Sequence, residues 1–321
     1  MKVHPHLFAK LFCQPLMLIE PVRYSLESAL LGQMGISQGN AEPAPAFARA
    51  AAAQREDENQ RSYGEHGEPM EDYLAYRRDA KATEAVLRIE NVYSRYGNVA
   101  VVQLNGVIDK HLSQFEMQCY GGYDLADFDR ALQIAEADRR IEHVVLAINS
   151  PGGSVTGVPE SAARVAALTK SKEVHAFIDG QACSAAYYIG SQADHIAAAP
   201  SAIIGSIGVY IALLDSSRNL EMEGYKVELI KAGKFKAMGA TFKPLADEDR
   251  ELLQARVTTL HQEFRAAVRS GRRTPTERGG HQSVSDAVME GQAFAGSDAL
   301  EHRLVDELTG ATLDEYVSAL L

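Results

Sequence analysis

The sequence predicts an α/β fold in which strands and helices alternate over residues 86–321. Two observations carry this prediction. Residues 144–149 and 174–180 are short apolar runs typical of strands buried on both faces of a sheet, and turn or helix-start residues follow each of them. Strands that alternate with helices in this way are typical of sheets with a parallel centre. We therefore expect one α/β domain in this part of the chain.

The remaining elements are expected from the period of the apolar residues. They are strands over 98–104, 195–199, 203–213 and 227–230, and helices over 125–137 and 248–269. The last helix is long enough to project from the sheet and to support self-association. The fourth of these strands leads into a loop that contains glycine and three lysines.

Two chain reversals at the ends of consecutive strands are the strongest functional signal. Residues 150–154 read Ser-Pro-Gly-Gly-Ser, a turn that can leave backbone N–H groups free to hold an oxyanion. Ser184 follows the next strand and opens a helix within a cluster of small residues. Both reversals should lie at one edge of the sheet, where they can supply a nucleophile and an oxyanion hole. The alternative is an ordinary N-cap serine beside an ordinary glycine turn.

A serine nucleophile needs a base at neutral pH. The chain has ten histidines, but their placement builds no recognisable triad, and His143 and His175 are better explained as packing residues of strands. The better candidates are Lys231, Lys234 and Lys236 in the loop after residues 227–230. The alternative is that this loop is simply basic and solvated.

Four segments resemble, in order and spacing, the signal peptide peptidase A family of serine peptidases. They are residues 149–154, 182–188, 204–209 and 232–236, and residues 292–306 are similar to the closing segment of that family. The resemblance runs from about residue 98 to residue 306. It implies the Clp protease/crotonase-like fold of repeated β-β-α units and a peptidase that uses a Ser-Lys dyad.

Carried over by position, the resemblance implies that Ser184 is the nucleophile, Lys236 the general base, and Ser206 the residue that orients Lys236. Ser206 and Lys236 follow Ser184 by 22 and 52 residues, in agreement with the family pattern. Gly153 and Ala185 would supply the N–H groups of the oxyanion hole. A lysine acts as a base only where burial favours its neutral amine, so Lys236 should be desolvated.

The chain departs from the family pattern immediately after the proposed nucleophile. Ala185 and Ala186 stand where the family usually has glycines, so the pocket is expected to be narrower. Cys183 lies beside Ser184 and offers a thiol as an alternative nucleophile, although small buried cysteines are common.

Composition excludes several classes of partner. The formal net charge of −11 disfavours nonspecific binding to nucleic acid. The three cysteines are an odd number without metal-ligand spacing, so we expect no disulfide, no metal and no cofactor. The apolar stretch over residues 7–19 is interrupted by Lys10, Gln14 and Pro15, which argues against a membrane span or a signal peptide. We expect a cytoplasmic protein that binds neither membranes nor nucleic acid.

The part before the α/β domain divides in two. Residues 1–35 carry leucine and phenylalanine at spacings that indicate an amphipathic arm. Residues 36–85 are rich in Ala, Glu, Gln, Arg and Pro without a sustained core pattern, which predicts a flexible linker. The alternative for this second part is an ordered helix that packs on a neighbouring subunit. Residues 86–321 would then be the Ser-Lys peptidase domain.

Residues 6–16 resemble the opening of one branch of the family, the head-maturation proteases of tailed phages. This implies a prohead protease that processes scaffold and portal or capsid proteins, assembles as a homo-oligomeric ring, and acts in the host cytoplasm or the prohead interior. One alternative is a soluble cellular signal-peptide-peptidase-like enzyme that degrades peptides. Another is a catalytically weak structural component of the phage head.

Two other enzyme classes share the implied fold. A Clp-type protease would need a catalytic histidine downstream of the serine, where residues 204–207 read Ile-Gly-Ser-Ile. A crotonase would bind coenzyme A and has no use for a Ser-Lys pair.

Overall fold

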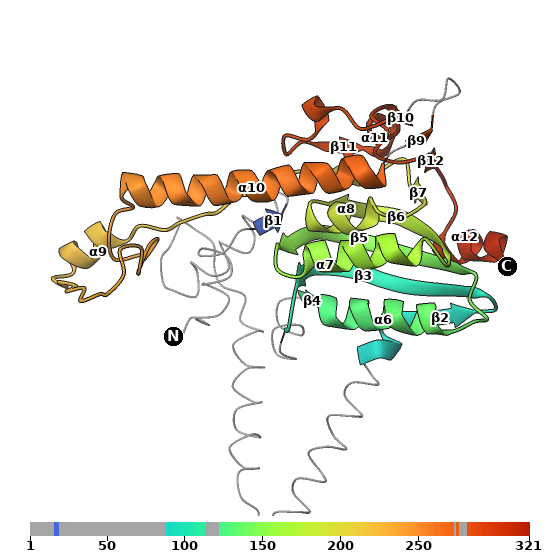
Figure 1. Ribbon diagram of the computed structural model, residues 1–321, viewed down its shortest axis with the longest axis horizontal. Coiled ribbons are helices and arrows are strands. Elements are labelled where there is room, and N and C mark those ends of the chain that lie inside the picture. The colour runs from blue at the N-terminus through green and yellow to red at the C-terminus, as the bar shows by residue number, and fades with distance from the viewer. Residues whose placement is uncertain (1–15, 19–87, 113–121, 273, 276–280) are drawn as a thin grey trace, which may run out of the picture.

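The computed structural model describes residues 16–18, 88–112, 122–272, 274–275 and 281–321 (Figure 1). Apart from residues 16–18, the predicted arm and linker therefore lie outside the described residues. The strands are β1 (Leu16–Leu18), β2 (Tyr93–Tyr96), β3 (Val99–Asp109), β4 (Gly122–Asp124), β5 (His143–Ser154), β6 (Glu173–Cys183), β7 (His195–Ala198), β8 (Ile203–Gly205), β9 (Thr274–Pro275), β10 (His281–Gln282), β11 (Ala293–Ala295) and β12 (Glu307–Leu308). The helices are α6 (Leu125–Ala137), α7 (Val158–Leu168), α8 (Ala185–Gly190), α9 (Ser217–Met222), α10 (Asp247–Gly271), the 3-10 turn η1 (Asp286–Val288), α11 (Gly296–Glu301) and α12 (Leu313–Leu320).

The centre of the main sheet is parallel and buried on both faces. Strands β3, β5, β6 and β7 pair side by side in parallel. On β5, Val144, Leu146 and Ile148 pack in the large core under α6, α7 and α8. Val145 and Ala147 point to the opposite face, where α12 covers a smaller core. Continuous burial of this kind explains why the strand sequence is apolar without alternation.

Each long strand changes its neighbours part of the way along. The β3/β5 register shifts between Asn105 and Val107, and the β5/β6 register shifts between Ile148 and Ser150. Beyond these shifts the end of β3 pairs with β4, the end of β5 with β1, and the end of β6 with β8. Each unit therefore consists of two strand segments followed by a helix, and the predicted α/β fold of repeated β-β-α units is confirmed.

Helix α6 begins and ends where its periodicity predicts, at residues 125 and 137. Asp124 fixes its start, because the carboxylate accepts hydrogen bonds from the backbone N–H groups of Ala126, His111 and Leu112 and also pairs with Arg88. The predicted helix over 248–269 is confirmed as α10, which extends slightly further at both ends.

Two of the predicted strands are wrong in extent or absent. The strand expected over 203–213 stops at Gly205, because Gly205 and Ser206 both have positive φ, 114° and 52°, and extended pairing cannot continue through them. Residues 227–230 form no strand in the described chain, and Ile230 is 92% exposed. Their apolar pattern is that of a strand, but no described strand pairs with these residues.

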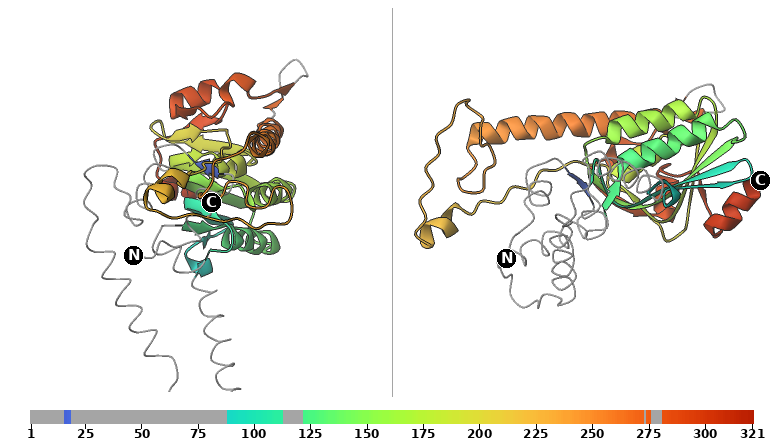
Figure 2. Two further views of the ribbon diagram at one scale, coloured as in Figure 1. Left: turned by 90° about the vertical axis from the view of Figure 1, so that its left-hand side faces the viewer. Right: turned by 90° about the horizontal axis from the view of Figure 1, so that it is seen from below.

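Residues 214–246 and the first half of α10 form an extension that projects from the sheet. Figure 1 shows α9 and the start of α10 at the far left, away from the sheet, and the right-hand view of Figure 2 shows the same projection from below. Only the C-terminal part of α10 is anchored, through Phe264 and Val268 in the core. Among the described helices, none combines the length and the apolar character needed to span a membrane.

Candidate active site

Ser184 occupies a strained turn between the end of β6 and the start of α8. Its backbone has φ 55° and ψ −119°, a conformation that is rare for a residue other than glycine. Such a conformation costs roughly 1–3 kcal/mol. Hydrogen bonds of both the N–H and the carbonyl group of Ser184 stabilise it. The N–H donates to the Gly205 carbonyl at 2.7 Å, and the Ser184 carbonyl accepts from the Tyr188 N–H at 2.8 Å.

The hydroxyl of Ser184 is buried and unpaired. The residue is 1% exposed, its Oγ has no hydrogen-bond partner among the described residues, and it does not cap α8. An unpaired buried hydroxyl costs about 1–3 kcal/mol. The N-cap alternative therefore explains the position of Ser184 but not its side chain. A sharp strand-to-helix turn that presents a free serine hydroxyl is the arrangement of a nucleophile.

Ser206 lies next to Ser184 across the β6/β8 pair. In the strand register Cys183 is the partner of Gly205. The next residues, Ser184 and Ser206, therefore lie opposite each other at the ends of the two strands. Ser206 is largely buried, and its N–H donates to the Gln292 carbonyl at 2.6 Å. The structure thus brings together these two predicted site residues.

Gly153 lies at the same edge of the sheet, near the end of β5. It stands between Ile108 of β3 and Met17 of β1 in the register. A Cβ atom at this position would lie 1.9 Å from the Ile108 carbonyl oxygen, so only glycine allows the backbones to approach this closely. The Ser150 hydroxyl fixes the turn before it by donating to the Gly106 carbonyl at 2.6 Å.

Ala185 is the first residue of α8, and backbone N–H groups in a first turn have no acceptor within the helix. The methyl groups of Ala185 and Ala186 are fully buried in the main core. They pack inside the protein and do not line an open surface beside Ser184.

The thiol alternative is disfavoured by burial. Cys183 is fully buried, and this burial raises the pKa of its thiol to about 12. The thiol lies against the Ile203 carbonyl, 3.5 Å away. A thiolate nucleophile is thus not available near neutral pH.

Lys236 is exposed and lies in the extension. The neighbouring Lys234 forms an ion pair with Glu248 at the start of α10, whereas α10 meets α8 at Phe264, which stacks on Tyr188 with ring centroids 4.8 Å apart. Glu248 and Phe264 are 16 residues apart on α10, or ~24 Å along a helix. Within this one chain, Lys236 is therefore not brought to Ser184. Lys231 is exposed in the same loop.

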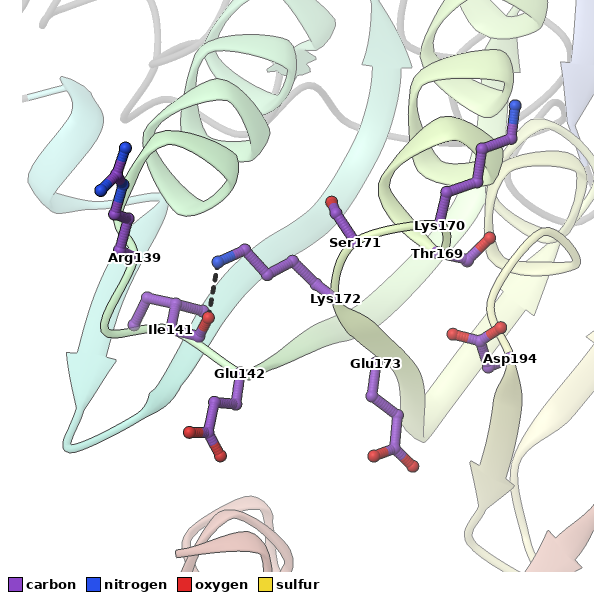
Figure 3. A pocket seen from close by; sticks show the side chains of 9 residues that line it. All are labelled: Arg139, Ile141, Glu142, Thr169, Lys170, Ser171, Lys172, Glu173 and Asp194. Carbon is purple, nitrogen blue, oxygen red and sulfur yellow. Dashed lines mark hydrogen bonds between the residues drawn. The ribbon is translucent and has the colours of Figure 1, made fainter.

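The histidines of the strands lie at the opposite end of the sheet. His143, His175 and His195 stand near the starts of β5, β6 and β7, whereas Ser184 follows the end of β6. A pocket at that opposite edge is lined by residues including Arg139, Lys172 and Asp194 (Figure 3). Neither the histidines nor this pocket belongs to the candidate active site.

The fold and this site define an α/β protein of repeated β-β-α units, in which the strand-to-helix turn after β6 holds a serine. Residues 166–319 match the family model described as Peptidase family S49. The family resemblance drawn from the motifs around Ser184 is thereby confirmed.

Named relatives include proteins from phages and from an archaeon. Capsid assembly protease C of Escherichia phage lambda is 26% identical over 318 residues, 96% of this chain and 64% of that protein. Head-tail preconnector protein GP5 of Enterobacteria phage P21 is 30% identical over 70% of this chain and 43% of that protein. A Methanocaldococcus jannaschii protein, named as a protease by inference, is 34% identical over 54% of each chain. The chain spans less than two thirds of the length of each of these relatives.

Solved structures are similar only at the level of broad shape. An enoyl-CoA hydratase/carnithine racemase from Magnetospirillum magneticum aligns over 71% of each chain at 14% identity, with a TM-score of 0.38. This likeness is too slight to bear on function.

Proposed function

We propose that the chain is a serine endopeptidase in which Ser184 is the nucleophile and Lys236 of a neighbouring subunit is the general base. The observation that carries the proposal is the strained backbone of Ser184 combined with its buried, unpartnered hydroxyl. Strain and an unpaired hydroxyl both cost stability, and a catalytic role accounts for both. The match to the model of peptidase family S49 supports the same reaction.

In this mechanism, Ser184 Oγ attacks the carbonyl carbon of a peptide bond while its proton passes to the neutral amine of Lys236. The N–H groups of Gly153 and Ala185 stabilise the resulting oxyanion. Lys236 then gives the proton to the leaving amine, and an ester to Ser184 remains. Water hydrolyses this ester with Lys236 again acting as the base. Ser206, level with Ser184 in the register, orients the amine.

The exposed apolar side chains of the extension support a base supplied in trans. Met222, Tyr225, Ile230 and Phe235 are between 40% and 92% exposed, which is unusual for a single segment of an isolated chain. A second copy that covers them would also give residues 227–230 a strand neighbour and remove water from Lys236. Head-to-tail contacts of this type form a ring where the rotation between subunits closes.

A peptide substrate fits the edge of the sheet beside Ser184. Leu16–Leu18 pairs there in antiparallel register with residues 152–154, so this edge accepts an extended segment in the structure itself. A substrate strand that takes this place would lie along Gly153 and bring its carbonyl groups toward the proposed oxyanion hole. Strand addition of this kind derives most of its affinity from main-chain hydrogen bonds.

For the biological substrate, we propose scaffold and portal or capsid proteins of a phage prohead. The support is the similarity to a phage capsid assembly protease over 96% of this chain, together with the similarity to a head-tail preconnector protein. The test is to incubate the purified protein with scaffold protein and to follow cleavage by mass spectrometry, alongside Ser184→Ala and Lys236→Ala variants. Cleavage by the wild type alone supports the proposal. Cleavage of unrelated peptides with no effect on scaffold protein would favour the cellular peptidase, and equal behaviour of all three proteins would refute the dyad.

A further inference from the structure

A cluster of metal-ligating side chains lies at the end of the sheet opposite Ser184. His143 begins β5 and stands opposite Glu173, the first residue of β6, while His175 follows two residues later on the same strand. All three side chains project from the face that α12 covers. We propose that His143, Glu173 and His175 bind a divalent transition-metal ion of the zinc class.

The distances between the potential ligand atoms fit such an ion. His143 Nδ1 lies 3.2 Å from Glu173 Oε2, and His175 Nε2 lies 3.4 Å from Glu173 Oε1. One ligand atom from each residue can be chosen so that all lie within 4.8 Å of one another. Nitrogen and oxygen ligands about 2.0–2.2 Å from zinc are ~3.3–3.6 Å apart in a tetrahedral site. The carboxylate oxygens of Glu173 already lie close to this spacing from the two histidine nitrogens.

Both histidine nitrogens that face Glu173 lack a hydrogen bond. His143 Nδ1 and His175 Nε2 are buried atoms without a hydrogen-bond partner among the described residues. The side chain of His175 is 7% exposed. A bound cation would satisfy both nitrogens and would neutralise the carboxylate between them.

The surroundings also resemble those of a metal site. The second ring nitrogen of His175, Nδ1, lies 3.1 Å from the Tyr316 hydroxyl of α12, and a partner of this kind fixes the orientation of a ligating imidazole. Glu173 is 57% exposed, so an ion can enter from solvent and water can complete the coordination. The ion would link β5, β6 and, through Tyr316, α12. His175 and Ser184 are nine residues apart on a strand, or ~30 Å, so the site would stabilise the fold without taking part in peptide cleavage.

The test is calorimetric titration of untagged, chelator-treated protein with zinc chloride, with thermal unfolding followed in parallel. The expected result is one saturable site per chain and a rise in Tm with zinc. Glu173→Gln and His143→Gln each remove one ligand at a partly exposed position and should weaken binding by at least tenfold, and Tyr316→Phe by roughly 10–100-fold.

His195→Gln is the matched control. His195 lies on the neighbouring strand, with its ring 6.0 Å from that of His175, but it pairs with Glu307 and lies outside the cluster. This variant should bind zinc as the wild type does. Absence of a saturable site, or zinc binding that survives unchanged in Glu173→Gln, would overturn the proposal. Because the readouts are binding and Tm, the result is independent of whether the chain cleaves peptides.

Discussion

Mixing two inactive variants tests whether the active site is shared between subunits. Ser184→Ala removes the proposed nucleophile, and Lys236→Ala removes the proposed base. Each variant alone should be inactive. In the proposed mechanism no chain completes its own site, because Lys236 is exposed and ~24 Å of α10 separate the ion pair of Lys234 from the contact with α8. A mixed ring, however, contains junctions at which an intact Ser184 meets an intact Lys236.

The size of the recovery follows from counting these junctions. In an equal mixture, half of the subunits carry Ser184 and half carry Lys236, and the two must be neighbours in the correct order. Random mixing of head-to-tail neighbours therefore restores about a quarter of the wild-type sites. If Ser184 and Lys236 acted within one chain, mixing would restore no activity.

The assay is cleavage of scaffold protein after subunit exchange. The two variants are dissociated, mixed, reassembled and compared with wild type carried through the same steps, and native mass spectrometry verifies that exchange has occurred. Lys231→Ala is the matched control, because Lys231 is an exposed lysine of the same loop, and this variant should be active alone. Verified exchange without recovered cleavage would refute the shared site.

Three further substitutions test the structure around the site. Gly153→Ala should lower the free energy of unfolding by at least ~1–3 kcal/mol and abolish cleavage, because its Cβ would lie 1.9 Å from the Ile108 carbonyl oxygen; urea unfolding that matches the wild type would contradict this contact. Asp306→Ala leaves the guanidinium of Arg272 buried without its partner and should cost about 3–5 kcal/mol in the same assay; a loss below 1 kcal/mol would be inconsistent with the pair. Burial raises the pKa of Cys183 from 9.0 to about 12, so the folded state keeps a proton that the unfolded chain loses, and stability should fall as pH rises through this interval. Cys183→Ala should make that part of the pH profile flatter, and an unchanged slope would argue against the shift.

The parts of the fold that depend on local pattern were predictable from the sequence. The bounds of α6 and the cores of β5 and β6 follow from the apolar period, and the turn at Ser184 follows from a strand that meets small residues. The strand over 203–213 was predicted too long, because the periodicity does not reveal the positive φ of Ser206.

Features that depend on pairing between distant segments were not predictable. The position of Lys236 relative to Ser184 depends on the path of the extension and, in the proposed function, on a second subunit. The sequence pattern does not distinguish Glu173, and it favours a packing role for His143 and His175. Only the strand register reveals that these three side chains converge. The Glu-x-His spacing of residues 173–175 is a signal at the start of β6, but it indicates a site only after the neighbouring strand is aligned.

The pairing of Leu16–Leu18 with the edge at Gly153 has a consequence for the kinetics of the proposed peptidase. A segment of the same chain that occupies the substrate edge is a competitor that never diffuses away, and its effective concentration does not fall when the protein is diluted. A dilute substrate would seldom displace it. A substrate packed at comparable density, or one held next to the enzyme inside a closed shell, would do so readily. Cleavage would then depend on crowding of the substrate more than on its sequence.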